Sequence, residues 1–296
     1  MVVAMTMAIG SNLQALGKAR SVLFAPAVRP DFVTRLGERG ADLVVIDCED
    51  ATPPGAKAEG RANARQLAPD LIVGGSKVIV RINPPATEWF GDDIVHGLIP
   101  GLSAVIVPKI ETIDQLEAVA NALDDAGLGS LGVFAGIETA LGVADARLVL
   151  SHPRVVAGYF GAEDFIADMA GVRTASNNEV HYARSQVALA ARLAGIPIVD
   201  QVVTDFGNDD RFIDESAQAR ALGYRGKLCI HPRQVELAND AFSPSSEELD
   251  RAKAMLDAYQ TASANGIAAI AFEGQMVDEP LAAQARNLLA AANDES

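Results

Sequence analysis

Two short apolar segments of this chain run directly into carboxylates. Residues 155–160 end at a glycine that is followed by Glu163 and Asp164, and residues 132–137 end on Glu138. Apolar segments of this length bounded by glycine are typical of buried parallel strands, and α/β folds place their chemistry at the carboxyl ends of such strands. Carboxylates on neighbouring strand ends suit a hard divalent cation such as Mg²⁺. The alternative is that one of the two is a helix cap or a surface acid.

Charged side chains also follow the other predicted strands. Each one alone has a structural explanation: Asp50 can cap the next helix, Lys109 can snorkel, and His231 can be a turn residue. Together, carboxylates, two arginines and a lysine around one mouth suit metal-assisted binding of a small carboxylate substrate. In chain order the residues at strand ends are Arg29, Asp47, Glu49, Asp50, Arg81, Asn83, Lys109, Glu138, Glu163, Asp164, Asp205 and His231.

Eight apolar segments alternate with stretches of helical period. Strict alternation of strands and helices predicts parallel strands with right-handed crossovers, and eight repeats predict a closed (β/α)8 TIM barrel. An open doubly wound sheet is the alternative, but no Gly-x-Gly-x-x-Gly motif follows any strand. The predicted strands are 21–25, 43–47, 78–82, 104–107, 132–137, 155–160, 197–203 and 227–230.

The length of 296 residues accommodates one such barrel with extensions at both ends. We expect residues 1–19 to form a loose N-terminal extension and residues 20–242 to form the barrel. Residues 243–296 contain two helical stretches that no barrel needs, separated by a glycine-bounded apolar stretch. This C-terminal helical extension can pack on the barrel, serve as an oligomer arm or act as a lid over the active site.

Composition limits the classes of function. A formal net charge of −15 argues strongly against nonspecific nucleic-acid binding. No apolar run approaches the length of a membrane-spanning helix, and the N-terminus lacks the features of a signal peptide. The two cysteines, Cys48 and Cys229, lie in apolar runs without metal or redox spacing. A cytoplasmic protein is therefore expected.

A series of motifs in fixed order resembles the family of the citrate lyase β subunit, malyl-CoA lyase and citramalyl-CoA lyase, within the HpcH/HpaI aldolase superfamily. The similarity extends from about residue 20 to about residue 290. The motifs are SVLFAP at 21–26, DCEDA at 47–51, VRIN at 80–83, PK at 108–109, IET at 137–139, GAED at 161–164, YARS at 182–185, GKLCIHP at 226–232 and FEGQMVD at 272–278.

The resemblance implies a (β/α)8 barrel, usually a homotrimer, that binds Mg²⁺, or Mn²⁺ in its place, through Glu138 and Asp164. It implies that Arg81 contacts keto-acid oxygens and that Asp278 is an acid/base on a lid from the neighbouring subunit. Arg29 and Lys57 fall where relatives meet substrate or coenzyme A. The complete predicted site has Asp278, Arg81, Glu49 and Asp50 as catalytic residues, Arg29, Arg81, Asp47, Lys57, Lys109 and Glu138 as substrate-binding residues, and Glu138 and Asp164 as metal ligands.

These parts predict a Mg²⁺-dependent carbon–carbon lyase that converts a 3-hydroxy-3-carboxyacyl-CoA, such as malyl-, citramalyl- or citryl-CoA, to a 2-oxo acid and acetyl-CoA. Two alternatives remain. One is an aldolase of the same superfamily that acts on free hydroxy-oxo acids without coenzyme A. The other is a subunit that works only inside a citrate lyase complex. For Asp278 itself, a plain helix N-cap ahead of Pro280 is the competing interpretation.

Overall fold

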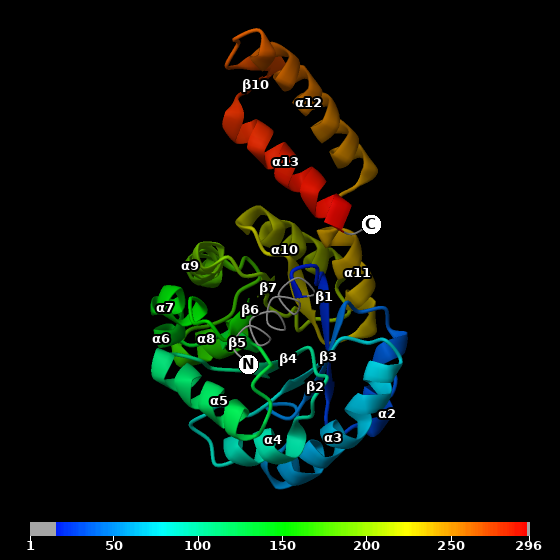
Figure 1. Ribbon diagram of the computed structural model, residues 1–296, viewed down its shortest axis with the longest axis vertical. Coiled ribbons are helices and arrows are strands. Elements are labelled where there is room, and N and C mark those ends of the chain that lie inside the picture. Colours follow the sequence, from blue (N-terminus) through cyan, green and yellow to red (C-terminus); the bar gives the residue numbers. More distant parts are fainter. Residues whose placement is uncertain (1–15, 295–296) are drawn as a thin grey trace. The chain divides into compact units, whose positions relative to one another are not determined.

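The computed structural model describes residues 16–294. Its centre is a closed barrel of eight parallel strands, each paired with the next along the chain and the eighth with the first, and helices surround the strands (Figure 1). The predicted (β/α)8 barrel is confirmed, and the open doubly wound sheet is wrong. The strands are β1 (Ser21–Pro26), β2 (Leu43–Asp47), β3 (Val78–Arg81), β4 (Ala104–Val107), β5 (Val133–Ile137), β6 (Val155–Phe160), β7 (Ile198–Asp200) and β8 (Gly226–Cys229).

Helices connect the strands on the outside of the barrel. Two short 3₁₀ helices, η1 (Leu36–Glu38) and η2 (Pro54–Ala56), accompany the longer elements. The α-helices of the barrel are α2 (Pro30–Val33), α3 (Lys57–Val73), α4 (Phe90–Gly97), α5 (Ile113–Asp125), α6 (Ala140–Ala144), α7 (Ala146–Leu150), α8 (Ala162–Asp168), α9 (Asn178–Ala194), α10 (Asp209–Leu222) and α11 (Pro232–Phe242).

Local signals set the ends of several helices. Helix α5 begins with a capping box, in which the Thr112 hydroxyl accepts from the Gln115 backbone N–H and the Gln115 side chain accepts from the Thr112 N–H. Helices α9 and α10 end at Gly195 and Gly223, which adopt left-handed φ values of 72° and 94° that glycine tolerates without strain.

Side chains on the two faces of the strands build two separate cores. The inner cluster contains strand residues such as Val45, Ile106 and Phe134, and no residue of the outer helices belongs to it. The outer cluster joins the other strand faces to the helices, for example Val80 of β3 and Leu116 of α5. The barrel is therefore filled by side chains, as in other barrels of this size.

The inner core also takes in the segment before the first strand. Leu16 and Ala19 are each 1% exposed and belong to the inner cluster. The predicted loose extension covered residues 1–19, of which residues 1–15 lie outside the described part of the chain. Residues 16–19 are not loose, because their apolar side chains complete the packing inside the barrel.

A network of buried charges joins the last two strands to α9 and α10. Arg184 donates two hydrogen bonds to Asp200, at 3.0 and 2.9 Å, and Lys227 donates to the same carboxylate at 2.7 Å. Glu215 lies 3.5 Å from the Lys227 ammonium and accepts from the Gln201 amide at 3.1 Å. We call these five residues the strand 7–8 network. Strand β7 ends at Asp200, immediately before Gln201, and not at residue 203 as predicted.

Both cysteines are buried and free. Burial raises the pKa of the Cys229 thiol to about 12. Burial, with nearby Asp93 and Asp47 carboxylates, raises the pKa of the Cys48 thiol well above its ordinary value. Among the described residues, no helix is long and apolar enough to cross a membrane.

The chain divides into two compact units, the barrel unit ending at Phe242 and a second unit that begins at Ser243. The second unit contains α12 (Ser246–Ala264), the antiparallel strands β9 (Ile270–Phe272) and β10 (Gln275–Val277), and α13 (Glu279–Asp294). It has a core of its own, which includes Leu256, Tyr259 and Val277. The hairpin was not predicted; Glu273 and Gly274, with φ values of 48° and 77°, make its two-residue turn.

Candidate active site

Arg81 and Asp47 form a doubly hydrogen-bonded pair at the ends of β3 and β2. The strands place the two residues opposite each other in register. The guanidinium donates from Nε at 2.7 Å and from Nη2 at 2.6 Å, and it lies over the Phe24 ring at 5.1 Å. Although burial opposes the shift, Asp47 raises the pKa of Arg81 well above its ordinary value. Arg81 is therefore a permanently charged group in a fixed orientation.

Lys109 brings three carboxylates together after the end of β4. Its ammonium lies 2.5 Å from Glu49 Oε1, 3.2 Å from Asp50 Oδ2 and 3.3 Å from Asp164 Oδ1. The residue has a left-handed backbone, with φ of 53°, which is uncommon for a residue other than glycine. Asp50 pairs with this lysine and caps no helix, since the N-caps of the following helices are Pro53 and Ala56.

Glu49 is a buried acid with incomplete hydrogen bonding. Its Oε2 lies 3.1 Å from Arg81 Nη1 but without the geometry of a hydrogen bond. Burial raises the pKa of the Glu49 carboxyl, against the lowering effects of Arg81 and Lys109. Burial acts to raise the pKa of the Asp50 carboxyl, but the Lys109 ammonium outweighs burial, and the pKa is lowered. The two neighbouring acids thus differ in how readily they hold a proton.

Glu138 follows the end of β5 and is 2% exposed. One of its carboxylate oxygens accepts two hydrogen bonds, and among the described residues no group donates to the other. Its Oε1 accepts from the Lys109 backbone N–H at 2.9 Å and from the Tyr159 hydroxyl at 3.0 Å. A Cβ at Gly161 would lie 2.3 Å from Oε2, so only glycine fits beside that oxygen. Burial, followed by the nearby Asp164 carboxylate, raises the pKa of the Glu138 carboxyl to about 7.

The donor set fits Mg²⁺. Glu138 and Asp164 supply carboxylate oxygens from the ends of β5 and β6, and both approach Lys109. Within residues 16–294 no group of three or more His, Cys, Asp or Glu side chains forms a metal cage. Mg²⁺ commonly binds through one or two carboxylates and retains several waters, so two protein ligands suit it. We call Asp47, Glu49, Asp50, Arg81, Lys109, Glu138 and Asp164 the mouth cluster.

Two predicted binding residues lie apart from these contacts. Lys57 is 5% exposed, and its ammonium donates to the backbone carbonyls of Cys48 and Glu49 at 3.0 and 2.8 Å. In this arrangement Lys57 supports the loop that carries Glu49 and Asp50. Arg29 is exposed, pairs with Asp31 at 2.7 Å and stacks on the exposed Phe32 ring at 3.8 Å. Its guanidinium is thus held by two neighbouring side chains and has no contact with the residues described above.

Asp278 belongs to the second unit, immediately before α13. Among the described residues no backbone N–H donates to its carboxylate, and Pro280 in the first turn has no N–H to offer. Its Oδ1 is buried without a hydrogen-bond partner. A side-chain helix cap does not account for this aspartate. An unpaired buried carboxylate oxygen is energetically costly.

Sequence reasoning missed Tyr159 and the glycines that fit around Glu138. A single hydroxyl inside the otherwise apolar run 155–160 was the available signal.

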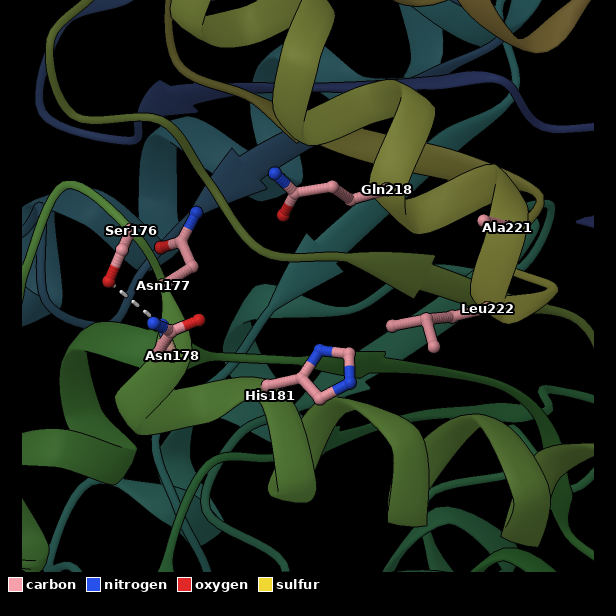
Figure 2. A pocket seen from close by; sticks show the side chains of 7 residues that line it. All are labelled: Ser176, Asn177, Asn178, His181, Gln218, Ala221 and Leu222. Atoms are coloured by element: carbon pink, nitrogen blue, oxygen red, sulfur yellow. Dashed lines mark hydrogen bonds between the residues drawn. The ribbon is translucent and has the colours of Figure 1, made fainter.

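A cavity of about 260 Å³ lies elsewhere, between α9 and α10 (Figure 2). It is lined by Ser176, Asn177, Asn178, His181, Gln218, Ala221 and Leu222. No carboxylate, arginine or lysine lines it, so the chemistry described above does not belong there.

The chain is similar to known proteins in sequence and in fold. The family model of HpcH/HpaI aldolase/citrate lyase matches residues 20–232. A citrate lyase subunit beta-like protein of Deinococcus radiodurans is 48% identical over 274 residues, which cover 91% of this chain and 96% of that protein. A (3S)-malyl-CoA thioesterase of Cereibacter sphaeroides is 30% identical over 273 residues, covering 92% and 94%. The crystal structure of CitE from Mycobacterium tuberculosis with magnesium, acetoacetate and coenzyme A has a TM-score of 0.78 at 30% identity and covers 95% of this chain and 99% of that chain.

Proposed function

The chain belongs to the HpcH/HpaI aldolase/citrate lyase family, and on this basis we propose that it is a Mg²⁺-dependent carbon–carbon lyase acting on a coenzyme A thioester. The substrate class is a 3-hydroxy-3-carboxyacyl-CoA of the malyl, citramalyl or citryl type, which is cleaved to a 2-oxo acid and acetyl-CoA. The observation that carries the proposal is the mouth cluster, in which Glu138 presents a free carboxylate oxygen beside Asp164 and the fixed guanidinium of Arg81.

Glu138 and Asp164 are the residues that would hold Mg²⁺. The bound ion would supply charge stabilisation to the carboxylate and the hydroxyl oxygen of the substrate. Arg81 adds donors fixed in place by Asp47, so that little reorganisation is needed as the hydroxyl carbon becomes a carbonyl carbon and the hydroxyl proton is released to water. Lys109 pairs with Glu49 and Asp50 and so offsets part of the negative charge next to that centre.

Asp278 is proposed as the acid that delivers a proton to the α-carbon of the acetyl-CoA enolate, or removes it in the condensation direction. Two features support this role: its carboxylate caps no helix, and its Oδ1 is unpaired and buried. We propose that residues 243–296 form a lid and that, in a homotrimer, Asp278 serves the barrel of the neighbouring subunit. A symmetric ring allows a C-terminal arm to reach the next mouth.

Product analysis tests the proposed function. Malyl-, citramalyl- and citryl-CoA are incubated with the purified full chain, with Mg²⁺ or with EDTA, and the products are identified by mass spectrometry. The proposal predicts acetyl-CoA and a 2-oxo acid only when Mg²⁺ is present. Free coenzyme A with an intact hydroxy acid would instead identify a thioesterase, the activity in the name of one relative. Cleavage of free hydroxy-oxo acids, or activity only with added partner subunits, would select the aldolase or the complex-bound subunit.

Mixing inactive subunits tests the shared site. Asp278→Asn and Glu138→Gln are each expected to be inactive, and Asp278→Asn is expected to retain Mg²⁺ and keto-acid binding because Asp278 is no ligand. Subunit exchange between the two variants should restore activity, since some mouths then combine an intact Glu138 with a neighbour's Asp278. Verified mixed oligomers without activity would place Asp278 over its own barrel.

A further inference from the structure

The hydroxyl of Tyr159 contacts the Glu138 carboxylate from inside the barrel. Tyr159 lies on β6, is 1% exposed and belongs to the inner cluster, where its ring meets Phe134 edge to face at 6.0 Å. Its hydroxyl donates to Glu138 Oε1 at 3.0 Å. Because the side chain is buried, the hydroxyl has the apolar interior around its ring and one carboxylate oxygen ahead of it.

The two donors to Glu138 act on the same oxygen. The Lys109 backbone N–H also donates to Oε1, at 2.9 Å, and no described residue donates to Oε2. The position of Gly161 explains why Oε2 is not crowded, since a Cβ there would lie 2.3 Å from it. A glutamate side chain has three rotatable bonds, and two donors on one oxygen restrict the direction in which the other points.

The neighbouring strand makes room for the phenol. Gly136 of β5 lies opposite Tyr159 in register, and a Cβ at Gly136 would lie 2.4 Å from the Tyr159 hydroxyl. The small residue on one strand and the large polar one on the next therefore fit as a pair. A phenylalanine at 159 would fill the same space but would leave Oε1 with the Lys109 N–H alone.

We propose that Tyr159 is a positioning residue that fixes the Glu138 carboxylate so that Oε2 points to the divalent cation, with Gly136 providing the space for it. This inference rests on the proposed function, because it gives Glu138 its role as metal ligand. Groups that orient a metal ligand from behind commonly change metal affinity ten- to a hundredfold when removed.

Mn²⁺ titration followed by electron paramagnetic resonance tests the inference without turnover. Tyr159→Phe is expected to raise the Mn²⁺ dissociation constant by about tenfold while keeping the ring in place. The matched control is Tyr224→Phe, because Tyr224 is also buried and its hydroxyl donates to the Arg184 backbone carbonyl at 2.9 Å. That variant should lose thermal stability and bind Mn²⁺ as the wild type does. A second variant, Gly136→Ala, should weaken Mn²⁺ binding in the same direction as Tyr159→Phe.

The outcomes separate this inference from the proposed function. Tight Mn²⁺ binding by both Tyr159→Phe and the wild type overturns the positioning role and leaves the lyase proposal intact. Equal weakening in Tyr159→Phe and Tyr224→Phe also overturns it, because the effect is then one of general stability. Absence of Mn²⁺ binding by the wild type overturns both. Under the proposal, activity of Tyr159→Phe returns toward the wild-type value at saturating Mg²⁺, so the defect lies in metal requirement and not in kcat.

Discussion

The mouth cluster and the strand 7–8 network each contain an arginine that donates two hydrogen bonds to one aspartate. Around Arg81 and Asp47 gather four more carboxylates and one lysine, so five acids face two cations. Around Arg184 and Asp200 the other members are Lys227, Glu215 and the neutral Gln201, so that two acids face two cations within the network, and Arg211 outside it pairs with Glu215 at 2.9 Å. The same residue types thus produce an excess of negative charge at the mouth and a balanced set between the last two strands.

The pKa values follow this difference. Burial and a neighbouring acid raise the pKa of the Glu138 carboxyl to about 7. Glu215 is also buried, yet Lys227 and Arg211 outweigh burial and lower the pKa of its carboxyl to about 2. Removal of one partner of a buried ion pair destabilises the fold because it leaves a buried charge uncompensated, whereas carboxylates with perturbed pKa values gather at functional sites. The comparison therefore supports a structural role for the strand 7–8 network and the proposed cation site at the mouth cluster.

The largest expected effect separates the two regions by activity. Glu138→Gln or Asp164→Asn should reduce turnover by more than about a thousandfold, because several kcal/mol of charge stabilisation depend on the metal. Glu215→Gln should lower the free energy of unfolding by about 3 kcal/mol and leave kcat/KM nearly unchanged in the folded protein. Steady-state kinetics and thermal denaturation of all three variants provide the measurement. Near-normal activity of Glu138→Gln in limiting Mg²⁺ would remove the metal assignment.

Two arginine substitutions sharpen the comparison. Arg81→Lys should reduce kcat/KM by roughly a hundredfold. Lysine cannot make the two parallel hydrogen bonds to Asp47 that orient the other N–H groups of the guanidinium toward the substrate. Arg184→Lys should chiefly lower Tm, because Arg184 is fully buried against Asp200. Equal kinetics for wild type and Arg81→Lys would reduce Arg81 to a counter-ion of Asp47.

The two regions should also respond to pH with opposite sign. The pKa of Glu138 is raised in the folded state, so its contribution to stability is full below about pH 4 and is lost as pH rises through about 7, a change of about 3 kcal/mol. The pKa of Glu215 is lowered, so its contribution is present above about pH 4 and is lost as pH falls toward 2. Denaturation of the EDTA-treated protein from pH 4 to pH 8 checks this. Glu138→Gln should abolish the loss at higher pH, and an unchanged slope would contradict the raised pKa.

The smallest of these effects concerns the space beside Glu138. Gly161→Ala should raise the Mn²⁺ dissociation constant about tenfold, because the new Cβ forces the carboxylate aside. Gly91→Ala is the control, since a Cβ at Gly91 meets no atom within 4 Å. Calorimetric titration of both variants gives the affinities. Unchanged affinity in Gly161→Ala would mean that Oε2 is not the oxygen that faces the cation.

Much of the fold was predictable because buried parallel strands appear in the sequence as short, continuous apolar runs. The bounds of β2, β4 and β6 match the predicted segments, since each is a short apolar run between polar or glycine-containing stretches. The same logic brought the residues at strand ends to one mouth, and Asp47, Arg81, Lys109, Glu138 and Asp164 do meet there.

Side-chain partners were less predictable, because they depend on distances that no linear spacing encodes. Lys57 was expected to meet the ligand, but its ammonium donates to two backbone carbonyls of the β2 loop. Tyr159 sits one strand away from Glu138 and 21 residues along the chain. The β9–β10 hairpin escaped notice because its strands have three residues each, too few to show a period of two.

The burial of Cys48 and Cys229 makes the chain a convenient background for site-directed labelling. These are its two cysteines, and their raised thiol pKa values leave almost no reactive thiolate at neutral pH. A cysteine introduced at an exposed position of the second unit, such as Met276, which is 67% exposed, would be modified selectively by a maleimide fluorophore or a nitroxide. Distances from that label to a second one on the barrel would test whether residues 243–296 act as the proposed lid when a thioester is added, without removal of any native residue that the fold requires.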